Sequence, residues 1–189
     1  GKEWSEIKSQ VPFRQLPMLI VDDKHEICQS IAILTYIESI AGLEINDPIL
    51  NAKANAILQS AQELFMPLNP TVNFAVGEDF QKRKEEMKPN LISRFEDLER
   101  ALNASKKTFF IDDKPRACDF AAFHHFDLSK KLDEEIINEF PRLVQFIGDI
   151  MSIDSIKIYL DNRPELINVS IEPKLILDGV PHPTGTIKT

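Results

Sequence analysis

A proline at position 17, and the residues that follow it, restrict the fold of this chain more than any other feature. Pro17 leads directly into the apolar run MLIV at residues 18–21. Proline has no backbone N–H to donate, so within a sheet it stands at an edge or at the start of a strand. An Asp-Asp-Lys turn occupies residues 22–24, and residues 25–28 can then pair back as a second strand. The sequence therefore predicts a β-hairpin over residues 18–28.

Two polar residues, Gln29 and Ser30, stand where the second strand passes into a helix. The helix is predicted by apolar residues with helical spacing, which are Ile31, Ile33, Leu34, Ile37 and Ile40. Gly42 is expected to end it as a C-cap. A helix N-terminus with small polar side chains can bind a carboxylate, although a Gln-Ser pair is also common as an ordinary cap. Together with Pro17, this segment indicates a site for an acidic, peptide-like small molecule.

From residue 48 onward the pattern is helical. Asp47 and Pro48 have the N-cap and first-turn residue types of a helix, which Pro67 and Pro70 are expected to stop. A second helix is predicted over about residues 80–103, and its Pro89 should kink or break it.

Two further helical regions follow. One begins near Arg116, where Asp119 stands in the position of an acid that reaches back to the helix start. Another begins near Asp133 and is divided at Pro141, and Pro164 is expected to close the last helix.

The order of these elements, strands first and helices afterwards, is typical of an α+β fold with segregated parts that is mostly α. We expect a hairpin-plus-helix module over residues 1–42, a linker over 43–47, an all-α domain over 48–166 and an extended C-terminal tail over 167–189.

Composition excludes several classes of function. The net charge of −8 disfavours nucleic acid or an anionic membrane as the main partner, and the sequence has no apolar run long enough to span a bilayer. The two cysteines have no CxxC spacing, and the polar N-terminus does not read as a signal peptide, which favours a reducing, cytoplasmic location. His124 and His125 are neighbours in a predicted helix, and no second ligand pair accompanies them, so we expect no metal site.

Several motifs in order resemble the cytosolic glutathione transferases, and most closely the sigma-like group that includes glutathione-dependent prostaglandin D synthases. Over residues 3–164 these motifs are E-W-x-E-I-K, P-F-x-Q-L-P, V-D-D, Q-S-x-A-I-x-x-Y-I, A-C-D-F-A-A-F and F-P-R-L-V-Q-F. The resemblance implies a partial thioredoxin-like module followed by the family's all-helical C-terminal domain. It also implies a homodimer, with glutathione as co-substrate and no other cofactor.

The resemblance assigns ligand roles to residues around the hairpin. Pro17 looks like the family's cis-proline, which would turn the Leu16 backbone toward the cysteinyl unit of glutathione. Gln29 and Ser30 look like the pair that holds the γ-glutamyl carboxylate. Arg14 stands where the family commonly carries glycine, so the backbone approach there is expected to differ.

Four more residues complete the implied glutathione site. Trp4 and Lys8 look like the residues that meet the glycine end, and Gln15 lies beside them. Glu63 falls close to the position of an acid that reaches the ligand amine of the neighbouring subunit. Trp4 as an ordinary core residue and Glu63 as a simple surface charge remain open alternatives.

The family's chemistry is activation of a thiolate that attacks an apolar electrophile. In sigma-like enzymes a tyrosine near the end of the first strand activates the sulfur, and neither Tyr36 nor Tyr159 matches that position. We assign no catalytic residue and expect an N-terminally shortened chain without the family's first β-α-β. Phe65 and Leu68 are candidates for the wall of the electrophile cleft, with core packing as the alternative. The alternative function is a non-catalytic, glutathione-transferase-like protein used for assembly or structure.

Overall fold

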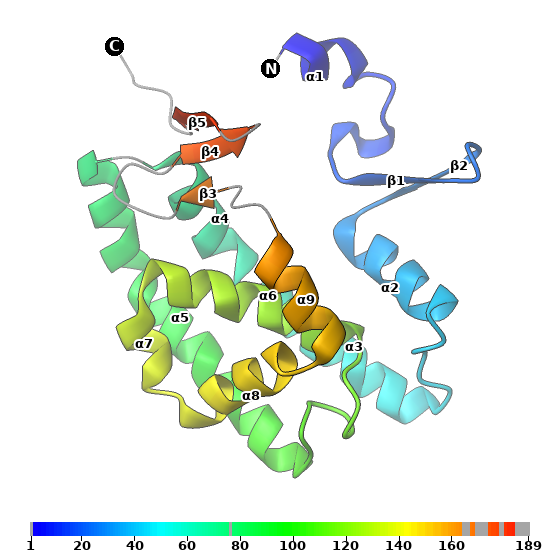
Figure 1. The fold of residues 1–189 in the computed structure, drawn as a ribbon, viewed down its shortest axis with the longest axis vertical. Helices are drawn as coiled ribbons and strands as arrows, with labels where there is room; N and C mark the ends of the chain where they lie inside the picture. Colours follow the sequence, from blue (N-terminus) through cyan, green and yellow to red (C-terminus); the bar gives the residue numbers. More distant parts are fainter. Residues whose placement is uncertain (1, 76, 164–166, 169–173, 178–179, 184–189) are drawn as a thin grey trace. The chain divides into compact units, whose positions relative to one another are not determined.

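The computed structural model of the chain describes residues 2–75, 77–163, 167–168, 174–177 and 180–183. It divides into two compact units, Gly1–Asn51 and Ala52–Thr189 (Figure 1). The first unit contains a β-hairpin between short helices, and the second is mainly helical.

The first unit follows the predicted order of strands and helix. Its elements are α1 (Lys2–Ile7), the 3-10 turn η1 (Pro12–Arg14), β1 (Met18–Val21), β2 (His25–Cys28) and α2 (Ser30–Ile40). The two strands pair antiparallel, with Met18 opposite Cys28 at one end and Val21 opposite His25 at the other. The predicted hairpin is therefore confirmed, with Pro17 immediately before its first strand.

The ends of the hairpin and of α2 are defined by local backbone geometry. The loop between the strands is Asp22–Asp23–Lys24, and the N–H of Lys24 donates to the Val21 carbonyl at 3.1 Å. Asp22 and Asp23 have φ values of 52° and 54°, the left-handed region that Asp tolerates in tight turns. At the end of α2, Gly42 has φ 66° and its N–H donates to the Ser39 carbonyl at 3.1 Å. The N–H of Leu43 donates to the Glu38 carbonyl at 3.0 Å, which completes a Schellman cap. The predicted glycine C-cap is confirmed.

The second unit is built mainly from helices. They are α3 (Pro48–Gln62), which begins in the first unit, α4 (Phe65–Phe74), α5 (Gly77–Ser105), α6 (Ala117–Leu132), α7 (Glu134–Asn138), α8 (Pro141–Met151) and α9 (Asp154–Asn162). Asp47 caps α3 as predicted, because its Oδ1 accepts the backbone N–H groups of Ile49 and Leu50, both at 2.8 Å. The division of the fourth helical region at Pro141 is also confirmed, since α7 ends before it and α8 begins there.

The prediction that Pro67 and Pro70 stop the first long helix was wrong. That helix ends at Gln62, and both prolines lie inside the next helix, α4. Pro67 is in the first turn of α4, where the missing N–H has no intrahelical partner to lose. Pro70 stands further inside, where tertiary packing outweighs the local preference: Leu68 and Val72 beside it are almost fully buried.

Pro89 does not break its helix either. The helix α5 runs without interruption for 29 residues with Pro89 inside. Its buried residues recur at helical spacing on both sides of the proline, and include Met87, Leu91, Phe95 and Leu98. A continuous apolar face therefore maintains the helix across a residue that removes one hydrogen bond.

The start of α6 is fixed by the carboxylate of Asp119, as predicted. Its Oδ2 accepts the backbone N–H of Arg116 at 2.8 Å, which is the reach-back expected of an acid in the first turn. Its Oδ1 accepts the N–H of Phe110 at 2.9 Å and so ties the preceding loop to the helix.

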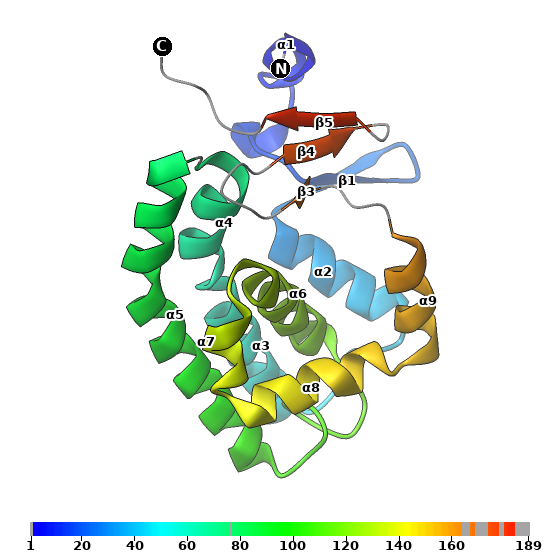
Figure 2. The ribbon, with the colours of Figure 1, turned by 60° about the vertical axis from the view of Figure 1, so that its left-hand side comes forward.

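The core of the second unit is rich in phenylalanine. The ring of Phe126 on α6 packs edge-to-face against Phe95 of α5 and Phe146 of α8, with centroids 5.7 and 5.9 Å apart. All three side chains are fully buried. Figure 2 shows α6 among the other helices of the unit, and it contacts α4, α7 and α8. Burial on several sides explains why α6 supplies so many core residues.

The C-terminal segment contains strands that the sequence interpretation missed. They are β3 (Ile167–Asn168), β4 (Lys174–Leu177) and β5 (Val180–Pro183), which pair antiparallel in that order. The expected extended tail is thus partly a small sheet, and its remaining residues lie outside the described part of the chain. Pro164, the expected end of the last helix, also lies outside it, and α9 ends at Asn162.

The fold is therefore mostly helical with a small two-stranded hairpin near its start. It agrees with the predicted class, a partial thioredoxin-like module followed by an all-helical domain.

Candidate functional site

The open end of the hairpin brings five of the predicted site residues into one short region. Met18 and Cys28 are the last paired residues, so the segment Gln15–Leu16–Pro17 enters beside the point where Gln29 and Ser30 leave. The Leu16–Pro17 peptide bond is cis. All five residues are exposed, so their polar groups are accessible from solvent.

Gln29 and Ser30 lie at the junction of β2 and α2. Gln29 is the N-cap of α2 with φ 74°, and its side chain makes no capping hydrogen bond. An ordinary capping role would have used that amide. The side chain is instead left at the helix N-terminus, where backbone N–H groups favour an anion.

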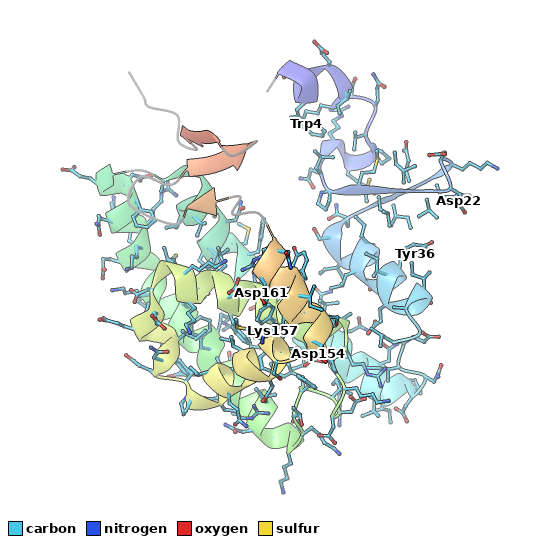
Figure 3. The ribbon with its side chains drawn as sticks, in the orientation of Figure 1. Trp4, Asp22, Tyr36, Asp154, Lys157 and Asp161 are labelled. Atoms are coloured by element: carbon cyan, nitrogen blue, oxygen red, sulfur yellow. The ribbon has the colours of Figure 1, made fainter. Side chains whose placement is uncertain are left out.

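Trp4 and Lys8 belong to the N-terminal helix rather than to the hairpin. Trp4 is half-buried on α1, and the N–H of Lys8 donates to its carbonyl at 2.9 Å as the helix ends. Figure 3 labels Trp4 on α1 and Asp22 at the turn of the hairpin. The Cys28 thiol lies 3.6 Å from the Pro12 carbonyl and so connects η1 to β2. This link joins the α1 end of the unit to the strand that leads to Gln29.

Arg14 has a backbone conformation that favours glycine. Its φ is 54°, and that of the preceding Phe13 is 59°. The position where the family commonly has glycine therefore keeps a left-handed backbone here, although it carries a side chain.

Glu63 lies in the second unit, between α3 and α4. Its Oε2 accepts a hydrogen bond from Nη1 of Arg94 on α5 at 2.7 Å, and its side chain is 59% exposed. The sequence interpretation missed Arg94, because a pair separated by 31 residues leaves no local pattern. Glu63 therefore has an ion-pair partner within the chain, which is compatible with its being a surface charge. Its carboxylate also stays accessible to solvent.

The two proposed cleft-wall residues differ in burial. Leu68 is 1% exposed and belongs to the core, which fits the packing alternative. Phe65, at the first position of α4, is 41% exposed.

Two buried titratable groups lie on α6. Burial raises the pKa of Asp119 to about 6, although its two backbone donors act in the opposite direction. Burial lowers the pKa of His125 to about 4, and the charge of His124 adds to this. The rings of the two histidines meet edge-to-face with centroids 5.1 Å apart. Nδ1 of His125 is buried without a hydrogen-bond partner in the part of the chain that the structure describes.

Over the described residues, no three histidine, cysteine or acidic side chains gather as metal ligands would. None of the described helices combines the length and apolar character that crossing a membrane requires. Cys28 and Cys118 are both buried, and neither forms a disulfide bond.

Two protein families match the sequence of this chain, one in each of its two units. Residues 67–163 match the family described as "Glutathione S-transferase, C-terminal domain", and residues 2–39 match "Glutathione S-transferase, N-terminal domain". The first match covers more than half of the chain. The chain therefore belongs to the glutathione S-transferase family, a family of transferases that use glutathione as co-substrate.

Individual relatives are distant but cover most of the chain. The chain is 27% identical to "Probable glutathione S-transferase 6" of Caenorhabditis elegans, over 87% of this chain and 81% of that protein. It is 28% identical to "Glutathione S-transferase Mu 1" of Macaca fascicularis, over 81% of this chain and 67% of that protein. The fold is also similar to the crystal structure of "monomeric Na-GST-3" from the hookworm Necator americanus, with a TM-score of 0.77 and 25% sequence identity. The matched region spans 87% of this chain and 82% of that protein.

Proposed function

We propose that this chain binds glutathione at the open end of its hairpin. Gln29 and Ser30 receive the γ-glutamyl carboxylate at the N-terminus of α2, and the Leu16 backbone before Pro17 pairs with the cysteinyl unit as an added strand would. The observation that carries the proposal is the exposed cluster of these residues at the open end of the hairpin, with the Gln29 side chain making no capping hydrogen bond.

The glycine end of glutathione is assigned to Trp4, Lys8 and Gln15. The exposed ammonium of Lys8 supplies a cation for that carboxylate on a chain whose net charge is −8. The Glu63 carboxylate would accept a hydrogen bond from the amino group of the glutathione bound to a second copy of the chain. Arg94 would hold its carboxylate in place through the 2.7 Å hydrogen bond.

The reaction is addition or substitution by the glutathione thiolate on an apolar electrophile. A free thiol has a pKa of about 8.5 and is mostly protonated at neutral pH, so the sulfur needs a hydrogen-bond donor that stabilises its ionised form. None of the residues proposed above is assigned that role, and they act by binding and orienting glutathione.

Finer assignments belong to the same proposal. The sigma-like class rests on the sequence motifs, and one of the relatives carries the name of the Mu class. We propose a cytoplasmic detoxification enzyme that acts as a homodimer, and a reducing location is consistent with two buried cysteines that form no disulfide. Because the hookworm relative is described as monomeric, light scattering coupled to size-exclusion chromatography is needed to measure the mass of this chain in solution.

Calorimetric titration with glutathione tests the binding site. Gln29→Ala and Ser30→Ala should each weaken affinity by about tenfold, as expected for the loss of one hydrogen bond to a charged group. Ser39→Ala is the matched control, because it removes an exposed hydroxyl from the same helix far from its N-terminus. Unchanged affinity in both site variants would contradict the proposed carboxylate contacts.

Turnover of a chromogenic electrophile separates the two functions that the sequence allows. Glutathione binding with measurable conjugation supports the transferase. Binding by a folded protein without conjugation supports the non-catalytic alternative instead.

A further inference from the structure

A polar cavity lies entirely within the second unit, Ala52–Thr189, called the helical unit below. It has a volume of about 480 Å³ and lies between the C-terminal end of α5, the loop that follows it and α8. None of the proposed glutathione residues lines it. Its walls carry three cationic side chains, which are Lys106, Lys107 and Arg142, and two acidic ones, Asp113 and Asp149. The lining thus carries one more positive than negative side chain, on a chain whose net charge is −8.

The guanidinium of Arg142 is held firmly at this cavity. Its Nη2 donates to the backbone carbonyls of Lys107 and Thr108, at 2.8 and 2.7 Å. Its Nη1 is buried and has no hydrogen-bond partner among the residues that the structure describes. The Asp149 carboxylate stands 3.8 Å away, beyond hydrogen-bond range. The charge of Arg142 is therefore fixed in position and only partly compensated.

The loop that forms the opposite wall is also ordered by specific contacts. The Asp113 carboxylate accepts the backbone N–H and the hydroxyl of Thr108, at 3.1 and 3.2 Å, and lies 3.1 Å from Nζ of Lys107. These bonds, led by the Thr108 N–H, lower the pKa of Asp113. Because its oxygens are already engaged, Asp113 is a poor ligand for a cation.

Lys106 is the cationic side chain with the most freedom. It is exposed at the rim, and no ion pair involves it within the described ranges of the chain. Asn103, Thr108 and Gln145 add neutral polar groups to the lining. A ligand with one negatively charged group and further polar atoms would match both kinds of lining.

We propose that this cavity binds a small oxyanion, a phosphate or carboxylate group carried by a polar molecule. Lys106 and Lys107 contact the anion, and the fixed charge of Arg142 attracts it without a direct contact from the buried Nη1. The site does not depend on the glutathione proposal, since it uses other residues in the other unit.

Titration of the ¹⁵N-labelled chain with inorganic phosphate, and separately with citrate, tests this inference. Saturable shifts of the backbone amides of Lys106, Lys107 and Thr108 are expected. The probe that saturates at lower concentration distinguishes a phosphate ligand from a carboxylate one. Added potassium chloride should weaken either interaction, because the contacts are partly exposed.

A matched pair of lysine variants separates a site from general attraction. Lys106→Gln should raise the apparent dissociation constant by about fivefold, as expected for one exposed charge contact. Lys114→Gln removes the same charge from the same loop outside the cavity, and should leave the constant nearly unchanged. An equal rise in the apparent dissociation constant in both variants would overturn the proposal. In the titrations, amide shifts confined to Ser30 and its neighbours would also overturn it, and so would the absence of saturable shifts with both probes.

Discussion

The hairpin unit, Gly1–Asn51, and the helical unit, Ala52–Thr189, differ in how completely they bury their apolar side chains. The helical unit buries large side chains completely, including Phe95, Phe126 and Phe146. In the described residues of the hairpin unit, the only buried apolar side chains are Val11 and Cys28. A densely packed core supplies most folding free energy, whereas an exposed surface supplies little.

Backbone strain is distributed in the opposite way. Among the described residues, left-handed φ values outside glycine occur at Phe13, Arg14, Asp22, Asp23 and Gln29 in the hairpin unit, and at Lys106 in the helical unit. Unfavourable backbone conformations concentrate at functional sites. Asp22 and Asp23 belong to the hairpin turn, whereas Phe13, Arg14 and Gln29 lie next to proposed glutathione residues. The contrast between the units fits our proposal that the hairpin unit presents polar groups to a ligand.

The largest expected effect comes from truncating the centre of the helical core. Phe126→Ala removes a fully buried ring that contacts Phe95 and Phe146, and should lower the free energy of unfolding by about 3–5 kcal/mol. Phe13→Ala is the matched control in the other unit, where the ring is 72% exposed, and should cost less than about 0.5 kcal/mol. Urea unfolding followed by circular dichroism measures both. Similar losses in the two variants would contradict the division of roles.

The sequence predicted the hairpin, α2, the caps at Asp47, Gly42 and Asp119, and the break before Pro141. Each of these depends on residues close together in the chain, whose preferences act locally. It failed at Pro67 and Pro70, which lie inside α4, and Pro89 does not break α5, because the apolar faces of these helices outweigh a proline's local preference.

Other features could not be predicted for a different reason. The Glu63–Arg94 pair and the cavity around Arg142 join residues that are far apart in the sequence, so no local pattern reveals them. The strands β4 and β5 had a local signal that was overlooked, since an Asp-Gly pair at residues 178–179 separates two short runs.

The second largest effect is expected at the start of α6. Asp119→Ala leaves the N–H groups of Phe110 and Arg116 without their acceptor, and should lower the free energy of unfolding by about 2–4 kcal/mol. Asp113→Ala also removes a carboxylate that accepts backbone and side-chain bonds, but an exposed one, and should cost much less. Thermal unfolding of the two variants makes the comparison, and an equal decrease in melting temperature would show that burial is not what makes Asp119 important.

The pH dependence of stability should reveal opposing groups on α6. The pKa of Asp119 is raised from 3.8 to about 6, so the folded state holds this proton more tightly and loses stability as the pH rises from about 4 to 6. The pKa of His125 is lowered from 6.5 to about 4, so the folded state releases its proton and gains stability as the pH rises from about 4 to 6.5. The pKa of His124 is lowered in the same direction. In the wild type these effects partly cancel.

Single variants separate these effects. Asp119→Asn should make the free energy of unfolding rise more steeply with pH between about 4 and 6 than in the wild type, and His125→Gln should make it rise less steeply or fall. Urea titrations at several pH values in this window measure the slopes, and slopes equal to that of the wild type would contradict the assigned pKa shifts.

The smallest effect on stability is expected at Glu63, where the question is whether the helical unit also contributes to ligand binding. Glu63→Gln weakens a hydrogen bond to Arg94 at a site that is 59% exposed, and should change the free energy of unfolding by less than about 1 kcal/mol. If the Glu63 carboxylate accepts a hydrogen bond from the amino group of glutathione bound to a second copy, Glu63→Gln should weaken the affinity for glutathione by about tenfold, because a charged contact is lost. Asp97→Asn is the control, because Asp97 also pairs with Arg94 and lies on the same helix. A loss of affinity confined to Glu63→Gln would extend the ligand site into the helical unit, and unchanged affinity would leave Glu63 as a surface partner of Arg94.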